Sequence, residues 1–441
     1  MNLNIDINLN KWASLIHLED KMQNTPNANR LHIAIFGRRN AGKSSLINSI
    51  TGQNIALVSE IAGTTADPVY KAMELLPIGP VVIIDTAGID DIGELGYLRV
   101  SKTKEVISKT DIAFLVFPAD TDWPIDLTLE KEWFSDLKEA GIPVIGVLNK
   151  CDVAMADSSV AMPASPRFAG SDLVEVTDSQ LALLKENFEM PFVKTSINDA
   201  SSIGALKKIL IENVPFYEKD VLVGDLFEPG DIVLLVAPQD IQAPKGRLIL
   251  PQVQVMRDVL DHKGLLITVT TDKLEDLLGK LKEFPKLVVT DSQVFEKVNA
   301  ILPKEIPLTS FSIVMARYKG DLNAFVDGAA AISKLEDGDK VLIAEACTHH
   351  ALQGDIGTEK LPRWLKEFTG KDLTFEKKTG IDFAEDLTGY KLIIHCGACM
   401  FNRKQMMSRI ILSKNQLVPI TNYGTAIAYM NGILPKVTKG L

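Results

Sequence analysis

The sequence predicts an α/β protein of three domains, each a mostly parallel sheet flanked by helices. Short apolar runs alternate with amphipathic stretches along nearly the whole chain, which is the pattern of βαβ units. The length of 441 residues corresponds to about three domains. Hydrophobic residues make up 46% of the chain and charged residues 24%, values typical of a globular protein rather than a disordered or fibrous one.

The first domain is expected over residues 1–215, where a series of apolar runs predicts buried strands. These runs are LHIAIFG (31–37), VVIIDTAG (81–88), IAFLVFPAD (112–120), PVIGVLNK (143–150) and PFVKTS (191–196). Segments with helical periodicity, such as KSSLINSITG (43–52) and LEKEWFSDLKEAG (129–141), lie between them. The Ser-, Ala- and Pro-rich segment 155–170 is expected to form an exposed loop.

A second domain is expected over residues 216–316. Its predicted strands are DIVLLVAP (231–238), LLITVT (265–270), KLVVTDS (286–292) and LTSFSIVMA (308–316). A helix is predicted over 250–264, because Pro251 is tolerated in a first turn and Gly264 ends the pattern. His262 lies at the end of this helix, where we expect it to cap the helix.

A third domain is expected over residues 317–441. Its predicted strands are KVLIAEAC (340–347), LTFEKK (373–378), KLIIHCGAC (391–399) and VPITNY (418–423), and its predicted helices are LPRWLKEFTG (361–370) and RKQMMSRIILSKN (403–415). The middle domain carries no catalytic constellation, which leaves it free to serve assembly.

Composition narrows the class of protein. A net charge of −10 argues against a general nucleic-acid coat, which needs a basic surface. Four cysteines do not make a disulfide framework and indicate a reducing compartment. The N-terminus lacks the basic and apolar regions of a signal peptide, and the apolar runs are too short to cross a bilayer. We therefore expect a cytoplasmic protein that binds neither membrane nor nucleic acid.

The segment GRRNAGKS, from Gly37 to Ser44, fits the phosphate-binding pattern G-x-x-x-x-G-K-[ST]. It follows an apolar strand and opens a helix, so its backbone N–H groups can surround phosphate oxygens at the helix N-terminus. Lys43 is expected to reach the outer phosphates, and the Ser44 hydroxyl to bind Mg²⁺. The predicted nucleotide-binding residues of this loop are Gly37, Asn40, Ala41, Gly42, Lys43, Ser44 and Ser45.

Further motifs, in the expected order, predict the rest of a guanine-nucleotide site. Asp85 in DTAG is expected to hold Mg²⁺ through water, Gly88 to offer its amide to the γ-phosphate, and Thr65 in GTTAD to bind Mg²⁺. Asp152 in NKCD can accept hydrogen bonds from the N1–H and the amino group of guanine, a donor pair that adenine lacks. The predicted catalytic residues are Lys43, Thr65, Asp85 and Gly88, and the predicted base-contacting residues are Asn149, Lys150, Asp152, Thr195, Ser196 and Ile197.

These motifs resemble the translation-factor-like P-loop GTPases, and within them the group that includes the tRNA-modification GTPase. Ile89 stands where other GTPases carry the glutamine that orients water, and Asn40 stands where this group uses an asparagine to help hold K⁺. The resemblance implies slow, K⁺-stimulated hydrolysis of GTP, assisted by dimerisation. Arg38 and Arg39 could act as an arginine finger in cis, but we expect them to be solvated loop charges.

Three of the four cysteines form one pattern with two histidines. Cys347-Thr-His349 is followed, after 45 residues, by His395-Cys396-Gly-Ala-Cys399. Each half follows an apolar strand, so the thiols can converge at one edge of a parallel sheet. Chemistry alone allows a structural Zn²⁺ site, an iron–sulfur cluster or buried thiols without metal. Cys151 is the variable position of NKCD and is not expected to be a ligand.

With CTH…HCGAC added to the GTPase motifs, the chain is similar to the FeFe-hydrogenase maturation GTPases, the HydF family. This resemblance implies a 4Fe–4S cluster held by Cys347, Cys396 and Cys399, with an exchangeable fourth iron site. His349 and His395 are the candidates for a labile ligand there or for a supporting role. It further implies a homodimer that carries a di-iron precursor with CO and cyanide ligands. Its expected partners are two radical-SAM maturases and the apo-hydrogenase.

The segment from His395 to the C-terminus contains six basic residues and no acidic ones. We hypothesise that Arg403, Lys404 and Arg409 hold an anionic precursor or guide the acceptor protein. Two other interpretations of the whole chain stay open. One is a zinc-containing GTPase of RNA modification or ribosome assembly, and the other is a redox-sensing cluster GTPase.

Overall fold

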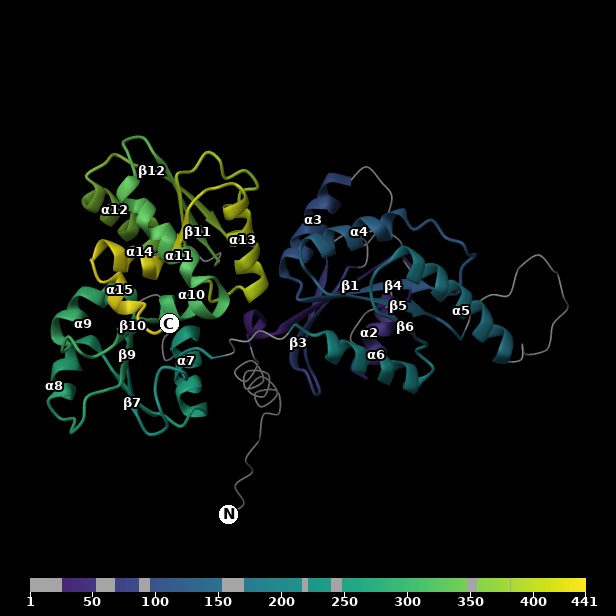
Figure 1. Cartoon of the computed structure of the whole chain (residues 1–441), viewed down its shortest axis with the longest axis horizontal. Helices are drawn as coiled ribbons and strands as arrows, with labels where there is room; N and C mark the ends of the chain where they lie inside the picture. The colour runs from purple at the N-terminus through teal and green to yellow at the C-terminus, as the bar shows by residue number, and fades with distance from the viewer. Residues whose placement is uncertain are drawn as a thin grey trace, which may run out of the picture. The chain divides into compact units, whose positions relative to one another are not determined.

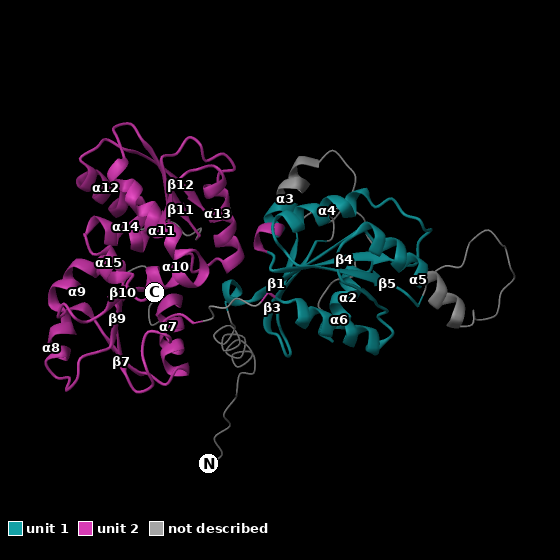
Figure 2. Ribbon diagram, in the orientation of Figure 1, with its two compact units in different colours: residues 1–106, 110–214 teal, residues 107–109, 215–441 magenta. Residues whose placement is uncertain are grey.

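The computed structural model describes residues 26–52, 68–86, 96–152, 170–215, 221–238, 248–346, 355–380 and 382–441. The chain divides into two compact units, coloured separately in Figure 2. Unit 1 comprises residues 1–106 and 110–214, and unit 2 comprises residues 107–109 and 215–441. Three sheets of mainly parallel strands, flanked by helices, confirm the predicted α/β fold class.

Unit 1 contains a six-stranded sheet in the order β2-β3-β1-β4-β5-β6 (Figure 1). Its strands are β1 (Leu31–Gly37), β2 (Val69–Leu75), β3 (Gly79–Asp85), β4 (Ile112–Pro118), β5 (Val144–Asn149) and β6 (Phe192–Lys194). Its helical segments are η1 (Asn27–Asn29), α2 (Lys43–Thr51), α3 (Gly96–Lys109), α4 (Thr128–Glu139), α5 (Gly170–Asn187) and α6 (Ala200–Asn213). The central strands β1, β4 and β5 are buried on both faces, as continuous apolar runs in a parallel sheet must be.

Strand β2 is absent from the sequence prediction. It is an edge strand that runs antiparallel to β3, and its residues alternate between exposed and more protected positions. A half-exposed edge strand carries polar residues such as Lys71 and Glu74, so it lacks the apolar run that marks the other strands.

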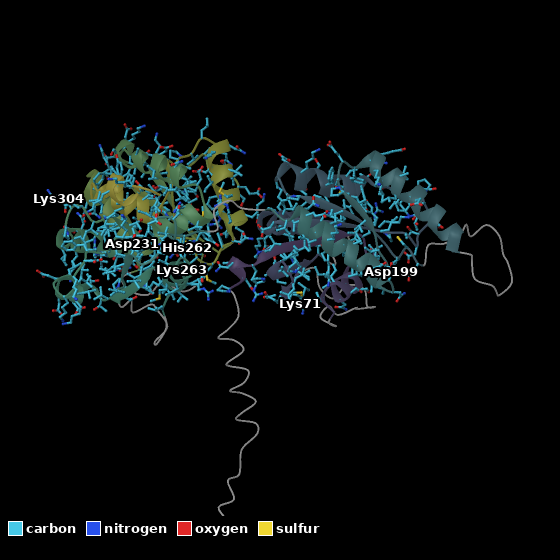
Figure 3. All side chains as sticks on the ribbon, turned by 60° about the horizontal axis from the view of Figure 1, so that its bottom comes forward. Lys71, Asp199, Asp231, His262, Lys263 and Lys304 are labelled. Atoms are coloured by element: carbon cyan, nitrogen blue, oxygen red, sulfur yellow. The ribbon has the colours of Figure 1, made fainter. Side chains whose placement is uncertain are left out.

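The first sheet of unit 2 has the order β10-β9-β7-β8 with all strands parallel. Its strands are β7 (Ile232–Val236), β8 (Leu265–Val269), β9 (Leu287–Thr290) and β10 (Leu308–Ser310). Its helical segments are α7 (Leu250–Asp261), η2 (Thr271–Lys273), α8 (Leu274–Leu278), η3 (Ser292–Val294), α9 (Phe295–Ile301) and α10 (Phe311–Lys319). His262, labelled in Figure 3, lies at the end of α7. Its capping role is confirmed, because its Nδ1 lies 2.8 Å from the carbonyl oxygen of Asp258.

The prediction of one strand over 308–316 is wrong beyond Ser310. The Ser310 hydroxyl accepts a hydrogen bond from the backbone N–H of Ile313 at 3.2 Å and thereby starts α10. A serine cap satisfies an N–H group that a helix otherwise leaves without a partner, so it converts the second half of the apolar run into a helix.

The second sheet of unit 2 has the order β12-β11-β13-β14 and is also parallel. Its strands are β11 (Lys340–Glu345), β12 (Thr374–Thr379), β13 (Leu392–His395) and β14 (Ile420–Asn422). Its helical segments are α11 (Leu322–Ala329), η4 (Ala330–Lys334), η5 (Ile356–Lys360), α12 (Leu361–Thr369), α13 (Arg403–Asn415), α14 (Tyr423–Met430) and α15 (Leu434–Val437). In the register of this sheet, Ala344 of β11 pairs with His395 of β13. The C-terminal ends of these two parallel strands therefore lie at the same edge of the sheet.

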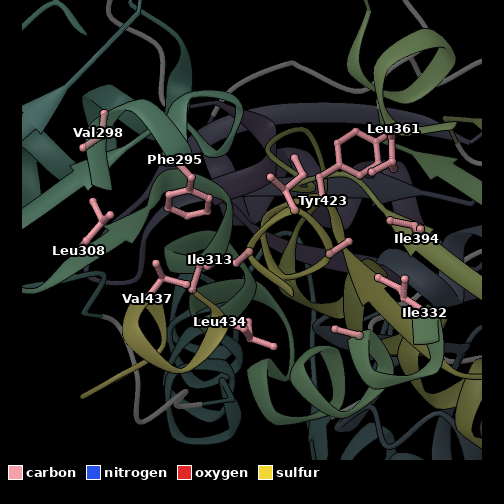
Figure 4. Packing of buried hydrophobic residues seen from close by; sticks show 14 of the residues in the cluster. Phe295, Val298, Leu308, Ile313, Ile332, Leu361, Ile394, Tyr423, Leu434 and Val437 are labelled. Atoms are coloured by element: carbon pink, nitrogen blue, oxygen red, sulfur yellow. The ribbon is translucent and has the colours of Figure 1, made fainter. Parts of the chain in front are cut away.

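One hydrophobic core extends beneath both four-stranded sheets of unit 2 (Figure 4). It joins Val288 of β9, Ile313 of α10, Ile394 of β13 and Tyr423 of α14. The predicted boundary between residues 316 and 317 falls within α10. The division of the chain into three domains remains a prediction.

Candidate functional site

The phosphate-binding loop runs from the end of β1 to the start of α2. Gly37 (φ +154°) and Gly42 (φ +87°) have no room for a side chain: a Cβ atom at Gly37 would lie 2.6 Å from the Val116 carbonyl oxygen, and one at Gly42 2.4 Å from Asn149 Nδ2. Asn40 also has a positive φ of 62°. The loop leads directly into α2, whose N-terminal N–H groups form a site that suits an anion.

Lys43 is buried at the start of α2 and points back into this loop. Its ammonium donates hydrogen bonds to the carbonyl oxygens of Gly37 and, at 2.9 Å, Arg38. The ammonium therefore already lies over the phosphate-binding loop. Nucleotide phosphates would replace these carbonyl oxygens as its acceptors.

The two described Mg²⁺ candidates of unit 1 meet at the edge of the sheet. The Ser44 hydroxyl donates to Asp85 Oδ2 at 2.9 Å, which joins the start of α2 to the end of β3. Hydroxyl and carboxylate oxygens are the ligands that Mg²⁺ prefers, so this pair fits the ion. Thr65 and Gly88, also predicted to act here, lie outside the described residues.

The predicted base-contacting residues come together at the ends of β5 and β6. Asn149 is fully buried, donates from Nδ2 to the Ala41 carbonyl oxygen at 3.0 Å and accepts from Thr195 Oγ1 at 3.0 Å. Lys150 has a positive φ of 61° and pairs with Asp120 at 2.8 Å.

A cavity of about 400 Å³ opens beside these residues, and its lining comprises Cys151, Asp152, Lys194, Thr195, Ser196, Asn198, Asp199 and Ser202. Asp152 Oδ2 accepts a hydrogen bond from Asn198 Nδ2 at 2.7 Å. This carboxylate is thus held at the wall of the cavity. Ile197, also predicted to contact the base, is exposed and does not line the cavity.

The expectation that Arg38 is a solvated loop charge is wrong. Its Nε donates to Glu130 Oε1 at 2.6 Å, and Glu130 is almost completely buried in α4. Arg38 is therefore a structural ion-pair partner rather than a solvated loop charge. No motif points to Glu130, because the two residues are 92 positions apart.

Cys396 comes directly after β13, and Cys399 follows three residues later. Cys396 Sγ accepts hydrogen bonds from the backbone N–H groups of Ala346, at 3.1 Å, and Ala398, at 3.4 Å. Ala346 comes directly before Cys347 in the chain, so the end of the strand that leads to Cys347 contacts the Cys396 thiol. Cys347 and His349 themselves lie outside the described residues, and the described part of the chain contains no group of three metal-binding side chains.

The chemistry of this edge fits a metal–thiolate group. Burial raises the pKa of the Cys396 thiol to about 11, so a bound metal has to displace its proton. The two N–H donors to Sγ stabilise a thiolate once it forms. Lys319 adds a positive charge at the same loop, although burial lowers its pKa to about 8, which leaves it protonated at neutral pH.

His395 lies behind the thiols and is fully buried. Arg409 Nη1 donates to His395 Nε2 at 2.8 Å, so the ring proton is on Nδ1, which donates to the Cys396 carbonyl oxygen at 2.9 Å. Burial and the charge of Arg409 lower the pKa of His395 to about 3. Both ring nitrogens are therefore engaged within the protein, an arrangement in which His395 supports the thiol loop.

The expectation that Arg409 faces an anionic cargo is wrong. Its guanidinium is buried, donates from Nη2 to the Gly380 carbonyl oxygen at 2.6 Å and lies 4.5 Å and 4.4 Å from the rings of Phe383 and Phe401. Arg403 donates to the Tyr318 carbonyl oxygen at 2.7 Å. Both guanidinium groups are thus held by backbone carbonyl oxygens inside unit 2, and that of Arg409 also by two aromatic rings.

Comparisons with known proteins agree with this arrangement. A family model described as "50S ribosome-binding GTPase" matches residues 32–150. The tRNA modification GTPase MnmE of Endomicrobium trichonymphae is 34% identical over 185 residues, which is 42% of this chain and 40% of that protein. MnmE of Desulfotalea psychrophila is 37% identical over 147 residues, which is 32% of this chain and 30% of that protein. The chain thus matches less than half the length of these relatives, and unit 1 is a GTPase domain.

Among solved structures, Era from Aquifex aeolicus bound to GDP and aluminium fluoride aligns with a TM-score of 0.33 and 18% identity, covering 61% of this chain and 97% of that one. Two further family models match unit 2: "Hydrogen maturase F dimerization domain" over residues 222–320 and "Hydrogen maturase F tetramerization domain" over residues 323–439. Unit 1 is thus a P-loop GTPase domain, and unit 2 matches two models of assembly domains in succession. The chain belongs to the hydrogen maturase F family. Among the described residues, no helix has the length and apolar character to span a membrane.

Proposed function

We propose that this protein is a GTP-hydrolysing scaffold and carrier for the maturation of an FeFe-hydrogenase in the cytoplasm. The observation that carries the proposal is the Ala346 N–H bond to Cys396 Sγ, which brings the strand end before Cys347 against the thiol of the C-x-x-C loop. Cys347, Cys396 and Cys399 would hold a 4Fe–4S cluster. The cluster would supply an exchangeable iron site at which a di-iron precursor with CO and cyanide ligands is held.

In unit 1, the chain's own residues bind and orient GTP. Asp152 recognises guanine, the loop from Gly37 to Ser44 surrounds the phosphates, and Ser44 with Asp85 holds Mg²⁺. Lys43 stabilises negative charge on the outer phosphates as water attacks the γ-phosphorus atom and GDP leaves. Asn40 contributes to a K⁺ site that accelerates this step.

In unit 2, assembly and delivery take place. The match to dimerization and tetramerization models supports an oligomer, of which a homodimer is the smallest form. The partners of the carrier are two radical-SAM maturases, which supply the precursor, and the apo-hydrogenase, which receives it. GTP acts as a conformational switch on these exchanges rather than as a reactant at iron.

The test is metal and sulfide analysis, with EPR spectroscopy, of protein purified and reconstituted without oxygen. We expect about four iron and four sulfide per chain and a reduced-cluster signal that shifts on addition of imidazole or cyanide. Transfer is then measured as activation of apo-hydrogenase by the loaded protein. About one zinc per chain, without sulfide or EPR signal, would overturn the cluster and favour a zinc-containing GTPase.

A further inference from the structure

Lys319 is a buried charge at the end of α10. Its side chain is 2% exposed, and within the described part of the chain it makes no ion pair with a carboxylate. Its ammonium instead donates to the backbone carbonyl oxygens of Phe401 at 2.7 Å, Cys399 at 3.2 Å and Ala398 at 3.5 Å. Burying an ammonium without a counter-ion costs free energy, because the charge loses its hydration. The carbonyl oxygens of the C-x-x-C loop offset this cost by accepting its hydrogen bonds.

The three carbonyl groups belong to a tight turn that needs support. Ala398 has a φ of +53°, a left-handed conformation that costs an ordinary residue free energy. The backbone N–H of Phe401 closes the turn onto the Ala398 carbonyl oxygen at 3.1 Å. Three converging carbonyl dipoles repel one another, and the ammonium among them offsets that repulsion and fixes the shape of the turn.

Lys319 and the C-x-x-C loop belong to different segments of unit 2. It lies within the segment that matches the dimerization model, whereas the C-x-x-C loop lies within the segment that matches the tetramerization model. Lys319 therefore fastens the thiol loop to a helix of the neighbouring sheet. The Lys319 ammonium, which contacts the Cys399 backbone, would also attract thiolates at Cys396 and Cys399.

We propose that Lys319 is the positioning residue of the C-x-x-C loop, holding its three carbonyl groups and balancing the negative charge of the thiolates and their metal group. This inference rests on the cluster site of the proposed function. Residues that orient metal ligands typically affect metal affinity by about ten- to a hundredfold. Loss of a nearby positive charge also makes a cluster harder to reduce, because reduction adds negative charge.

The experiment compares wild-type protein with Lys319→Met, which keeps the length of the side chain but removes its charge and donors, and with Lys319→Arg, which keeps the charge. Lys436→Met is the matched control, since Lys436 binds Asn299 instead of the loop. Each full-length protein is titrated anaerobically with Co²⁺, followed by thiolate charge-transfer absorption. Each is then reconstituted with iron and sulfide for an EPR-monitored redox titration.

We expect Lys319→Met to bind Co²⁺ about tenfold or more weakly and to show a more negative midpoint potential. Lys319→Arg should stay closer to the wild-type potential, and Lys436→Met should match wild type. If circular dichroism shows that Lys319→Met does not fold, Lys319→Gln takes its place. This variant removes the charge but keeps an N–H donor. Wild-type affinity and potential in a folded, uncharged variant would overturn the inference.

Two other outcomes are also decisive. Unfolding of both uncharged variants would show that Lys319 supports the whole of unit 2 rather than the loop, and would overturn the inference as well. If wild-type protein itself binds neither Co²⁺ nor iron and sulfide, the proposed cluster site fails. Equal binding by wild type and Lys319→Met would instead overturn only the role of Lys319.

Discussion

Asn149, at the end of β5, donates a hydrogen bond to the carbonyl oxygen of Ala41 in the phosphate-binding loop across 108 positions of sequence. The same side chain accepts from Thr195 of the loop after β6. One buried amide thus links the segments predicted to recognise the base to the loop predicted to surround the phosphates. These two hydrogen bonds hold the three segments at fixed positions relative to one another.

Replacement of Lys43 tests the phosphate end of the site. Lys43→Ala should lower kcat for GTP hydrolysis by about a hundredfold or more, because a preorganised donor to the transition state is lost. Phosphate release measures this effect. The control is Lys138→Ala, since Lys138 pairs with Glu189 at the surface of unit 1. Iron and sulfide content should be unchanged in Lys43→Ala, and loss of both properties together would contradict separate sites.

Replacement of Asp152 tests the choice of base. Asp152→Asn should weaken GTP binding by about ten- to a hundredfold, because two hydrogen bonds to a carboxylate are lost. The amide can donate to a carbonyl oxygen, so the variant should gain affinity for xanthosine triphosphate. Titration with fluorescent analogues of both nucleotides measures the exchange. Unchanged preference for GTP would show that Asp152 does not recognise the base.

Replacement of Arg38 tests its role as an ion-pair partner. Arg38→Ala leaves Glu130 buried without this partner and should destabilise unit 1 by about 1–3 kcal/mol. This lies below the roughly 3–5 kcal/mol expected for a fully buried pair, because Arg38 itself is partly exposed. Thermal unfolding followed by circular dichroism measures the change. Adding Glu130→Gln should restore part of the loss, since the uncompensated charge is then removed. A melting temperature equal to wild type would contradict the structural role.

Alkylation of Cys151 tests whether this thiol, which lines the cavity beside Asp152, is protected from solvent. Burial raises the pKa of this thiol to about 11, and only the thiolate reacts with iodoacetamide. The rate should therefore be low at pH 7–8 and rise about tenfold per pH unit until the pH approaches the pKa. Mass spectrometry of the Cys151 peptide gives the rate, and the urea-unfolded chain is the reference. Equal rates at pH 7 in folded and unfolded protein would contradict the raised pKa.

The parts of the fold that follow local rules could be predicted from the sequence. Buried parallel strands such as β1 and β5 appear as apolar runs, and the motifs at their ends mark the nucleotide site. Strand β2 could not be recognised, because pairing at an edge depends on the partner strand more than on its own residues. Helix α10 could not be distinguished from a strand, because it lies in a continuous apolar run. Ser310 is the one residue in that run that indicates a helix start.

The supporting contacts of the thiol loop could not be predicted, because they arise only from tertiary structure. Lys319 lies 79 to 82 positions before the carbonyl groups that it binds. In the sequence, Arg409 is one of several basic residues in a charged tail, yet its guanidinium is buried against His395. A sequence motif identifies residues that perform chemistry, but residues that orient them carry no fixed spacing.

The continuous core of unit 2 limits how this protein can be divided or recombined. A cut between Gly320 and Asn323 would separate the segments matched by the two assembly models, but it would expose apolar faces contributed by both, such as Val288 and Ile394. Neither half would be a portable module. A chimaera that keeps a functional thiol loop should therefore receive both segments from the same parent protein.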